Sequence, residues 1–279
     1  MKKLFSNLNE QRVANAFSLQ AKVFDEQYSN DGIIQYKRQR VRKHISKWLS
    51  RKSNVLELNS GTGEDAIWLA KQGHLVHATD ISENMLEILH KKINSSVLKS
   101  SISYELCSFT QLNNLYYRGP YDMIFSNFAG LNCTAELDKA LRQFSPLLKK
   151  GGMVTLVILP PFCLWEFLLI FKGMFATATR RIWARKGAPA KVEGNQFTCF
   201  YYHPAYIVDK LRDEFKLLKV EGLCTVVPPS YISHFVEKHP GIFNFLKGRE
   251  TKLKDKWPWK NIGDYYIISL QKTGANSPG

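Results

Sequence analysis

The stretch from Val55 to Ala70 constrains the fold of this chain more than any other. A short run with the character of a buried strand, Val55–Leu58, leads into the glycine turn Gly61-Thr62-Gly63, and a helix-forming segment follows. Glycines at these two places let the backbone turn sharply and approach a ligand where a Cβ atom would clash. A helix that begins there points its unpaired N–H groups at that ligand. The stretch therefore predicts a strand, a turn and a helix, with a ligand site at the turn.

Glu57 narrows the kind of ligand. The pattern Gly61-x-Gly63-x-x-Ala66 also fits the dinucleotide-binding fingerprint, so the glycines alone are a weak signal. A carboxylate four residues before Gly61 repels a pyrophosphate and suits a ligand that carries cationic or hydroxyl donor groups. An NAD-dependent enzyme is therefore the weakest of the alternatives.

Strands and helices alternate from Val55 onward. This order predicts an α/β fold: a Rossmann-like, mostly parallel seven-stranded sheet, with an N-terminal helical cap and an inserted lid between strand five and the following helix. Right-handed crossovers place the ligand at the carboxyl ends of strands one and two. The expected strands are 55–58, 75–79, 102–106, 121–126, 153–159, 216–222 and 265–270, and the expected helices are 10–24, 34–49, 64–72, one capped by Ser82, 134–149 and 204–214.

These elements suggest four regions. Residues 1–52 form the N-terminal helical cap, and residues 53–160 form the ligand-binding core. Residues 161–203 are an insert that we interpret as an acceptor lid. Residues 204–279 complete the core and carry a second insertion.

The balance of charge points to an anionic partner. The chain has 39 Lys and Arg against 24 Asp and Glu, a net charge of +15, which favours nucleic acid, an acidic membrane surface or an acidic substrate. Part of this charge lies on the second expected helix, and there we favour a solvated surface over an anion-binding role. The basic residues of that helix face are Lys37, Arg40, Arg42, Lys43 and Lys47.

Cysteine usage and the first residues suggest a cytoplasmic protein. The five cysteines are spread along the chain without a C-x-x-C pair, which favours a reducing compartment, no disulfide frame and no zinc site. Residues 1–10 lack the apolar core of a signal peptide. No H-E-x-x-H motif or carboxylate cluster indicates a metal site.

Asp80 supplies a second ligand-binding signal. It closes the second expected strand, 17 residues after Gly63. In a Rossmann-like sheet this position faces the ribose of a bound nucleoside, where a carboxylate can accept hydrogen bonds from both ribose hydroxyls.

The pattern Glu57-x-Asn59-x-Gly61-x-Gly63, then Asp80, then Tyr121–Asn127, resembles the class I S-adenosylmethionine-dependent methyltransferases. It looks closest to the ubiquinone/menaquinone-methyltransferase-like branch. The likeness covers about 36–159 and the final strands. It implies S-adenosyl-L-methionine as cofactor, and its motifs are specific for the superfamily but poor for the acceptor.

The resemblance also implies a role for each matching position. Glu57 would contact the methionine amino group, Asp80 would hold the ribose, and Asn127 would lie at the methionine end. Ser108 stands where an Asp often binds the adenine amino group, so that contact would fall to its hydroxyl or to the Phe109 backbone. The full set of cofactor-binding candidates is Tyr28, Glu57, Asn59, Gly61, Gly63, Asp80, Ile81, Met85, Ser108, Phe109 and Asn127.

Asn59 departs from the family pattern, in which glycine is usual. A side chain there should either contact the methionine end of the cofactor or displace it slightly. For the acceptor, His203 is the catalytic candidate, as a general base or substrate contact, because related folds use the region before the late helix to line the acceptor pocket.

The segment Phe162–Phe171 is apolar on nearly every side of a helix and is followed by a basic stretch. Such a helix must be buried or face lipid. We consider a core-packed lid, a lipophilic acceptor tunnel whose basic rim touches anionic lipid, and, ranked last, an RNA-binding surface.

Our leading hypothesis is a methyltransferase that acts on a hydrophobic small molecule, aromatic or lipid-like, at oxygen or carbon. The alternatives are a nucleic-acid methyltransferase, suggested by the charge, and a non-catalytic binding protein with a methyltransferase fold, suggested by Asn59 and Ser108. The sequence gives neither the acceptor nor the oligomeric state.

Overall fold

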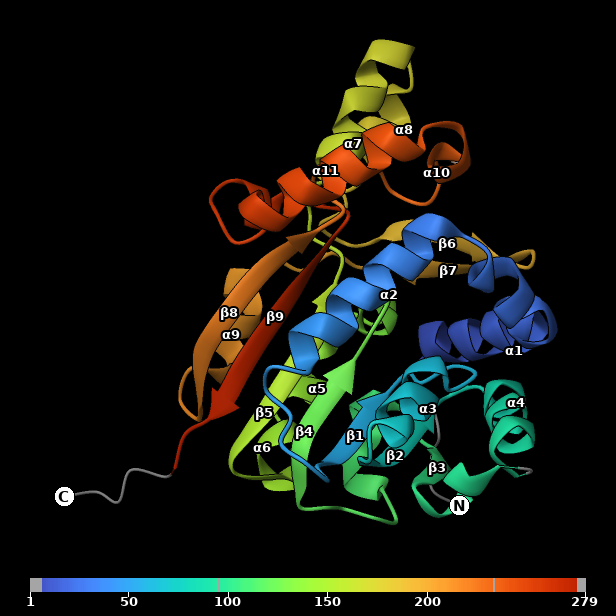
Figure 1. Cartoon of the computed structure of the whole chain (residues 1–279), viewed down its shortest axis with the longest axis vertical. Helices are drawn as coiled ribbons and strands as arrows, with labels where there is room; N and C mark the ends of the chain where they lie inside the picture. The colour runs from blue at the N-terminus through green and yellow to red at the C-terminus, as the bar shows by residue number, and fades with distance from the viewer. Residues whose placement is uncertain (1–6, 95, 233, 275–279) are drawn as a thin grey trace.

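A computed structural model describes residues 7–94, 96–232 and 234–274 (Figure 1). Its centre is a seven-stranded sheet in the order β3-β2-β1-β4-β5-β9-β8. Strands β1 to β5 pair in parallel, and only β9 runs antiparallel to both of its neighbours. The predicted fold class is therefore confirmed. The strands of this sheet are β1 Asn54–Leu58, β2 Leu75–Asp80, β3 Ile102–Leu106, β4 Tyr121–Ser126, β5 Leu148–Ile158, β8 Phe215–Leu223 and β9 Tyr265–Lys272.

Helices cover both faces of the sheet (Figure 1). Successive strand residues point to opposite faces, so Val55 packs in one core and Leu56 in the other. The first core includes residues of α2 (Gly32–Ile45), α3 (Glu64–Lys71) and α4 (Glu83–Asn94). The second includes residues of α5 (Leu137–Leu141), α6 (Phe144–Leu147) and α9 (Pro204–Leu211). Short 3₁₀ turns lie at η1 Val97–Ser100, η2 Phe109–Asn114, η3 Gly130–Cys133 and η5 Trp259–Asn261.

The single helix predicted over 134–149 is wrong. The chain forms the short helices α5 and α6 and enters β5 at Leu148. Pro146 lies within α6, and a proline cannot donate a backbone hydrogen bond to a preceding turn, so one continuous helix is disfavoured. Strand β5 then runs through Gly151-Gly152, just beyond the predicted helix.

The insert 161–203 folds into two different parts. The first is a run of short helical turns, α7 Leu164–Phe167, η4 Leu168–Lys172 and α8 Phe175–Thr179, and we call residues 164–186 the arm. The second is the antiparallel hairpin of β6 (Ala188–Val192) and β7 (Asn195–Cys199). This hairpin packs on α1 (Leu8–Ser29), with the rings of Phe17 and Phe197 6.1 Å apart.

The basic face of α2 is only partly solvated, so the prediction of a solvated surface is wrong for two of its residues. Lys37 is 2% exposed and pairs with Asp264 at 3.6 Å. Arg40 pairs with Glu221 at 3.5 Å and with Glu250 at 3.2 Å. Their anions are carboxylates of the same chain. Among the other basic residues of this face, Lys43 and Lys47 are exposed as expected and Arg42 is half-buried.

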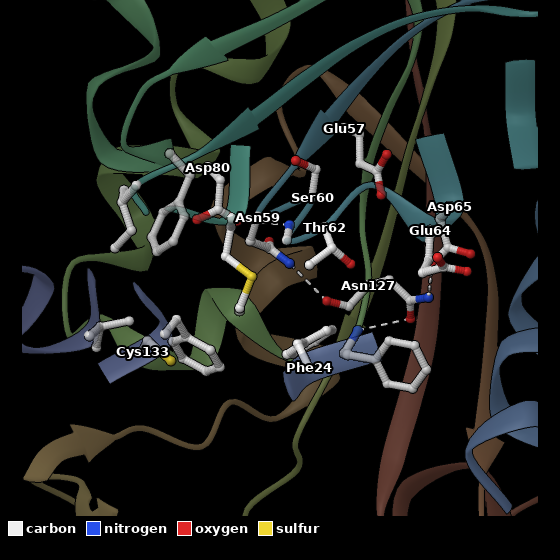
Figure 2. Close-up of a pocket in the computed structure, with 18 of the residues that line it drawn as sticks. Phe24, Glu57, Asn59, Ser60, Thr62, Glu64, Asp65, Asp80, Asn127 and Cys133 are labelled. Carbon is white, nitrogen blue, oxygen red and sulfur yellow. Dashed lines mark hydrogen bonds between the residues drawn. The ribbon is translucent and has the colours of Figure 1, made fainter. Parts of the chain in front are cut away.

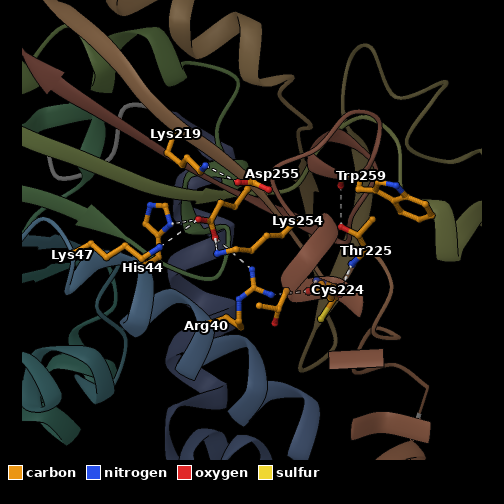
Figure 3. Close-up of polar contacts among 12 residues, drawn as sticks. Arg40, His44, Lys47, Lys219, Cys224, Thr225, Lys254, Asp255 and Trp259 are labelled. Atoms are coloured by element: carbon orange, nitrogen blue, oxygen red, sulfur yellow. Dashed lines mark hydrogen bonds and ion pairs between the residues drawn. The ribbon is translucent and has the colours of Figure 1, made fainter. Parts of the chain in front are cut away.

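Glu250 ties the C-terminal insertion to the sheet. It lies on α11 (Pro240–Leu253), which follows α10 (Phe235–Lys238), and it is fully buried. Its carboxylate accepts the backbone N–H groups of residues 224–227 at 2.8–3.0 Å and the hydroxyl of Tyr36 at 3.0 Å. Figure 3 shows Arg40 from α2 and the Cys224-Thr225 loop meeting at this place. One carboxylate thus joins α2, α11 and the loop after β8.

None of the described helices is both long enough and apolar enough to cross a membrane.

Replacing Glu250 with Gln should destabilise the fold. The variant keeps the shape of the side chain but loses the charge that compensates Arg40 and one of the two strong acceptors for the loop amides. We expect a loss of about 3–5 kcal/mol in the free energy of unfolding, measured by urea denaturation. The matched change at the exposed Glu26 on α1 should stay within about 0.5 kcal/mol. Equal effects of the two changes would contradict the anchoring role.

Candidate functional site

A cavity lies at the carboxyl ends of β1, β2 and β4, beneath helix α1. Figure 2 shows Glu57 and Asp80 at the strand ends, facing Phe24 and Cys133 across the cavity. This is the edge of the sheet at which the sequence placed the ligand. The cavity is lined by Val13, Phe17, Phe24, Arg38, Glu57, Asn59, Ser60, Gly61, Thr62, Glu64, Asp65, Asp80, Ile81, Met85, Cys107, Phe109, Asn127, Phe128, Gly130 and Cys133.

The glycine turn has the geometry that its sequence requires. Gly63 has a φ of +81°, and a Cβ atom there would lie 2.2 Å from a methyl carbon of Leu89, so a larger residue would displace α4. Gly61 has a φ of +55° with open space around its missing Cβ. Ser60 accepts the N–H of Gly63 at 3.0 Å and donates its own N–H to the Thr79 carbonyl at 3.0 Å. The turn is therefore fixed against β2 while its surface stays open to the cavity.

Asp80 holds the turn as well as facing the cavity. Its carboxylate accepts the N–H of Gly61 at 2.8 Å and the N–H of Ser82 at 2.9 Å. Burial raises the pKa of Asp80 above its usual value, although the bonds from these amides act in the opposite direction. Each carboxylate oxygen has two acceptor positions, so Asp80 keeps capacity for a ligand hydroxyl.

Glu57 has an unsatisfied carboxyl oxygen. Its side chain is 2% exposed, and within the described part of the chain its Oε2 atom has no hydrogen-bond partner. Burial, and then the nearby negative charge of Asp65, raise the pKa of Glu57 well above its usual range. The hydroxyl of Ser60 also lacks a partner there. A buried acceptor left open in this way is costly unless a ligand supplies a donor.

Asp65, which the sequence analysis did not single out, is compensated instead. It accepts bonds from Arg38 at 3.2 Å, from Arg42 at 2.8 Å and from the side-chain amide of Asn127 at 2.7 Å. Acidic residues in the first turn of a helix stabilise the helix dipole, and this was the one signal that could have drawn attention to it. Arg38 is thereby neutralised within the cavity wall.

Asn59 joins the ends of β1 and β4. It adopts a left-handed conformation with φ 47°. Its amide donates to the Asn127 carbonyl at 2.8 Å, and its oxygen accepts the hydroxyl of Ser126 at 2.5 Å. Gly130 leaves room for it, since a Cβ atom at that position would lie 2.3 Å from the Asn59 side chain. The departure from glycine thus has a structural partner on β4 and the following loop.

Helix α1 closes the cavity and is fastened to the core on both sides of it. The hydroxyl of Thr62 donates to Asp25 at 2.6 Å, and the hydroxyls of Ser18 and Ser82 lie 2.8 Å apart. Three apolar residues of α1 line the cavity: Val13, Phe17 and Phe24.

Ser108 does not line the cavity, contrary to the sequence expectation. Its hydroxyl bonds to the buried Glu10 of α1 at 3.1 Å and caps the turn that begins at Phe109. Thr110 also donates to Glu10, at 2.8 Å. A carboxylate from the N-terminal helix therefore lies against Ser108, while Phe109 does line the cavity, as expected.

Three other expected residues do not line this cavity. One is Gly63, whose missing Cβ faces Leu89 of α4. Tyr28 lines a smaller neighbouring pocket, where its hydroxyl accepts a bond from Gln20 at 3.2 Å. His203 caps α9, with Nδ1 accepting the N–H of Ala205 at 3.1 Å, and lies in a separate surface hollow. The geometry lends no support to His203 as a base at this cavity.

The insert also differs from expectation, because none of residues 161–203 lines the cavity. Its fold does bring together Cys163, Glu166 and Asp264, whose ligand atoms lie within 4.8 Å of one another. Arg181 already bonds Glu166 at 2.7 Å and Asp264 at 2.8 Å, which makes this a buried ion-pair cluster.

Replacing Glu57 with Gln should stabilise the unliganded protein. A carboxyl whose pKa is raised by folding contributes its stability below its unfolded pKa and loses it as the pH rises through the folded pKa. Glutamine carries no such penalty, so the variant should gain on the order of 1–3 kcal/mol at neutral pH. Thermal unfolding from about pH 4.5 to about pH 8 should show the gain growing with pH. A gain independent of pH would contradict a buried, uncompensated charge.

Residues 55–152 match the family model described as a methyltransferase domain. A demethylmenaquinone methyltransferase from Leptospira interrogans is 33% identical over 102 residues, which cover 36% of this chain and 40% of the relative. The chain therefore matches less than half the length of this curated relative.

Solved structures share the fold over nearly the whole chain. The magnesium protoporphyrin IX methyltransferase from Synechocystis with bound SAM has a TM-score of 0.59 at 15% identity, covering 96% of this chain and 100% of that one. The [4+2]-cyclase SpnF has a TM-score of 0.60 at 14% identity, covering 98% and 99%. At such identities the likeness establishes the fold alone. The family-model match thus shows a methyltransferase domain over residues 55–152, and the solved structures show that the chain as a whole shares the fold of these proteins.

Proposed function

We propose that the chain binds S-adenosyl-L-methionine in this cavity and transfers its methyl group to a hydrophobic small-molecule acceptor, aromatic or lipid-like, at oxygen or carbon. The observation that carries the proposal is the open acceptor of Glu57. It is a buried carboxylate oxygen without a partner in the described chain, beside a glycine turn whose surface faces the same cavity. A ligand ammonium group would supply both the positive charge and the hydrogen-bond donor that the Glu57 carboxylate lacks.

The other residues fit the rest of this cofactor. We assign the methionine amino group to Glu57 with the Ser60 hydroxyl, and the ribose to Asp80. The apolar end of the cavity, with Ile81, Met85 and Phe109, suits the adenine ring. Gly61 would pass close to the cofactor, and Asn59 and Asn127 would border its methionine end.

Bound there, the cofactor supplies an electrophilic methyl group on a sulfonium. The chain's own residues then have to orient the donor and the acceptor and exclude water. Helix α1 closes the cavity with aromatic side chains, and the Asn59–Asn127 bond fixes the two strand ends against each other. The described lining residues include no histidine, lysine or tyrosine.

The apolar lining supports an uncharged, lipophilic acceptor. Phe24 from α1 and Phe128 after β4 both border the cavity. The one cation of the described lining, Arg38, is held by Asp65 and stacks on Phe128 at 5.0 Å. An acidic acceptor would therefore meet carboxylates without a free positive charge. We propose a cytoplasmic location with peripheral membrane contact, and we rank nucleic acid last as an acceptor.

Replacing Glu57 with Gln should weaken cofactor binding, although the same change should stabilise the unliganded protein. Titration calorimetry with S-adenosylhomocysteine should give a loss of about 1.5–3 kcal/mol in binding free energy for Glu57→Gln, because a charge-assisted hydrogen bond is lost. Asp80→Asn should lose about 1–3 kcal/mol. The matched change at the exposed Asp213, Asp213→Asn, should have no effect. No binding by the unmodified chain at millimolar ligand would refute the cofactor assignment.

Methyl transfer should appear in lipid-soluble material. We expect the chain, incubated with methyl-labelled S-adenosylmethionine and an extract of the source cells, to label the lipid-soluble fraction and not the nucleic-acid fraction. Demethylmenaquinone is the first pure acceptor to test, because the Leptospira relative is named for it. Label in nucleic acid would favour the alternative enzyme. Cofactor binding with no label in any fraction would favour a non-catalytic binding protein.

A further inference from the structure

The arm places large apolar side chains in solvent. Figure 1 shows α7 and α8 at one end of the molecule, beyond the carboxyl ends of the parallel strands. Phe171 is 84% exposed, Phe175 63% and Trp183 78%. The sequence allowed a core-packed lid here, and the structure contradicts it, because a lid of that kind would bury these rings. Exposed apolar groups gathered on one segment indicate a surface that contacts another body.

The arm is strongly basic. After Glu166, its residues 167–186 contain five Lys and Arg and no Asp or Glu. Arg181 is buried in the ion-pair cluster. By contrast, Lys172, Arg185 and Lys186 are exposed beside the aromatic residues. The free surface of the arm is therefore apolar and positively charged, which complements an apolar layer bordered by anions.

The arm is anchored to the core. Glu166 on α7 accepts bonds from Arg180 at 2.7 Å and from Arg181 at 2.7 Å. Arg181 continues to Asp264, at the start of β9, at 2.8 Å, and the N–H of Leu164 donates to the Ile262 carbonyl at 2.9 Å. Because these polar groups point inward, the outer side of the arm is left with aromatic rings and free cations.

We propose that the arm is a docking surface for an anionic lipid bilayer. Phe171, Phe175 and Trp183 insert at the boundary between headgroups and acyl chains, where aromatic side chains are favoured. The exposed cations contact lipid phosphates. A projecting arm of short turns can enter such a boundary, whereas a protein interface needs a broad complementary surface. The proposal specifies the peripheral membrane contact proposed above, and it stands apart from methyl transfer, since it concerns binding alone.

Vesicle sedimentation tests this surface with the full chain. We expect binding to vesicles of phosphatidylcholine and phosphatidylglycerol in equal parts, and much weaker binding to phosphatidylcholine alone. A variant with Phe171→Ser, Phe175→Ser and Trp183→Ser should lose about tenfold or more in vesicle affinity. A variant with Lys172→Gln, Arg185→Gln and Lys186→Gln should lose about fivefold for each charge removed, on the anionic vesicles only.

The control removes exposed apolar groups elsewhere. Tyr116 is 95% exposed and Val97 is 94% exposed, and Tyr116→Ser with Val97→Ser should leave vesicle binding unchanged. All variants should keep the thermal unfolding temperature of the parent and its affinity for S-adenosylhomocysteine. No vesicle binding by the parent, or equal binding by all variants, would overturn the proposal. Two other results would also overturn it. One is light scattering that shows a dimer in the parent and none in the variant without the three aromatic residues, and the other is RNA binding by the parent that the variant without the three cations loses.

Discussion

The structure depends on helix α2 as an internal source of positive charge. Buried carboxylates are expensive unless they are paired, and α2 supplies partners to carboxylates in three separate regions. Arg38 neutralises Asp65 beside the cavity, Lys37 reaches Asp264 below the arm, and Arg40 meets Glu250 of the C-terminal insertion. One helix thereby positions the ligand site, the arm and α11 relative to one another.

Against this background, Glu57 is the exception that gives the cavity its chemistry. Asp65 lies close by and receives three donors, whereas Glu57 keeps an open oxygen. The difference is a matter of position. Asp65 lies in the first turn of α3, beneath α2, and Glu57 lies near the end of β1. Among the described residues, α2 makes no hydrogen bond to Glu57. In the described part of the chain, α2 thus compensates Asp65, Asp264 and Glu250, whereas Glu57 keeps an oxygen open for a ligand.

Much of the core could be predicted from the sequence, because local rules decide it. The glycine turn, the strand ends and the position of Asp80 follow from backbone conformation and from the geometry of parallel sheets. The pairing of Ser108 with Glu10 could not be read, because 98 residues separate the two and no local pattern links them. The exposure of the arm could not be predicted either, because an apolar segment has the same sequence pattern whether other parts of the protein cover it or leave it in solvent. The break of the helix predicted over 134–149 follows from a local rule, because Pro146 disfavours one continuous helix.

Asn59 and Gly130 have a consequence for how sequences of this kind diverge. The side chain of one occupies the space that a Cβ atom of the other would need, at 2.3 Å. Alanine at 130 is therefore compatible only with a smaller residue at 59, and glycine at 59 removes the constraint on 130. Among homologues the two positions should covary as a pair, even though 70 residues of chain lie between them. A substitution at one position that is harmless in a relative would be damaging here, so that the order in which such changes accumulate is itself constrained.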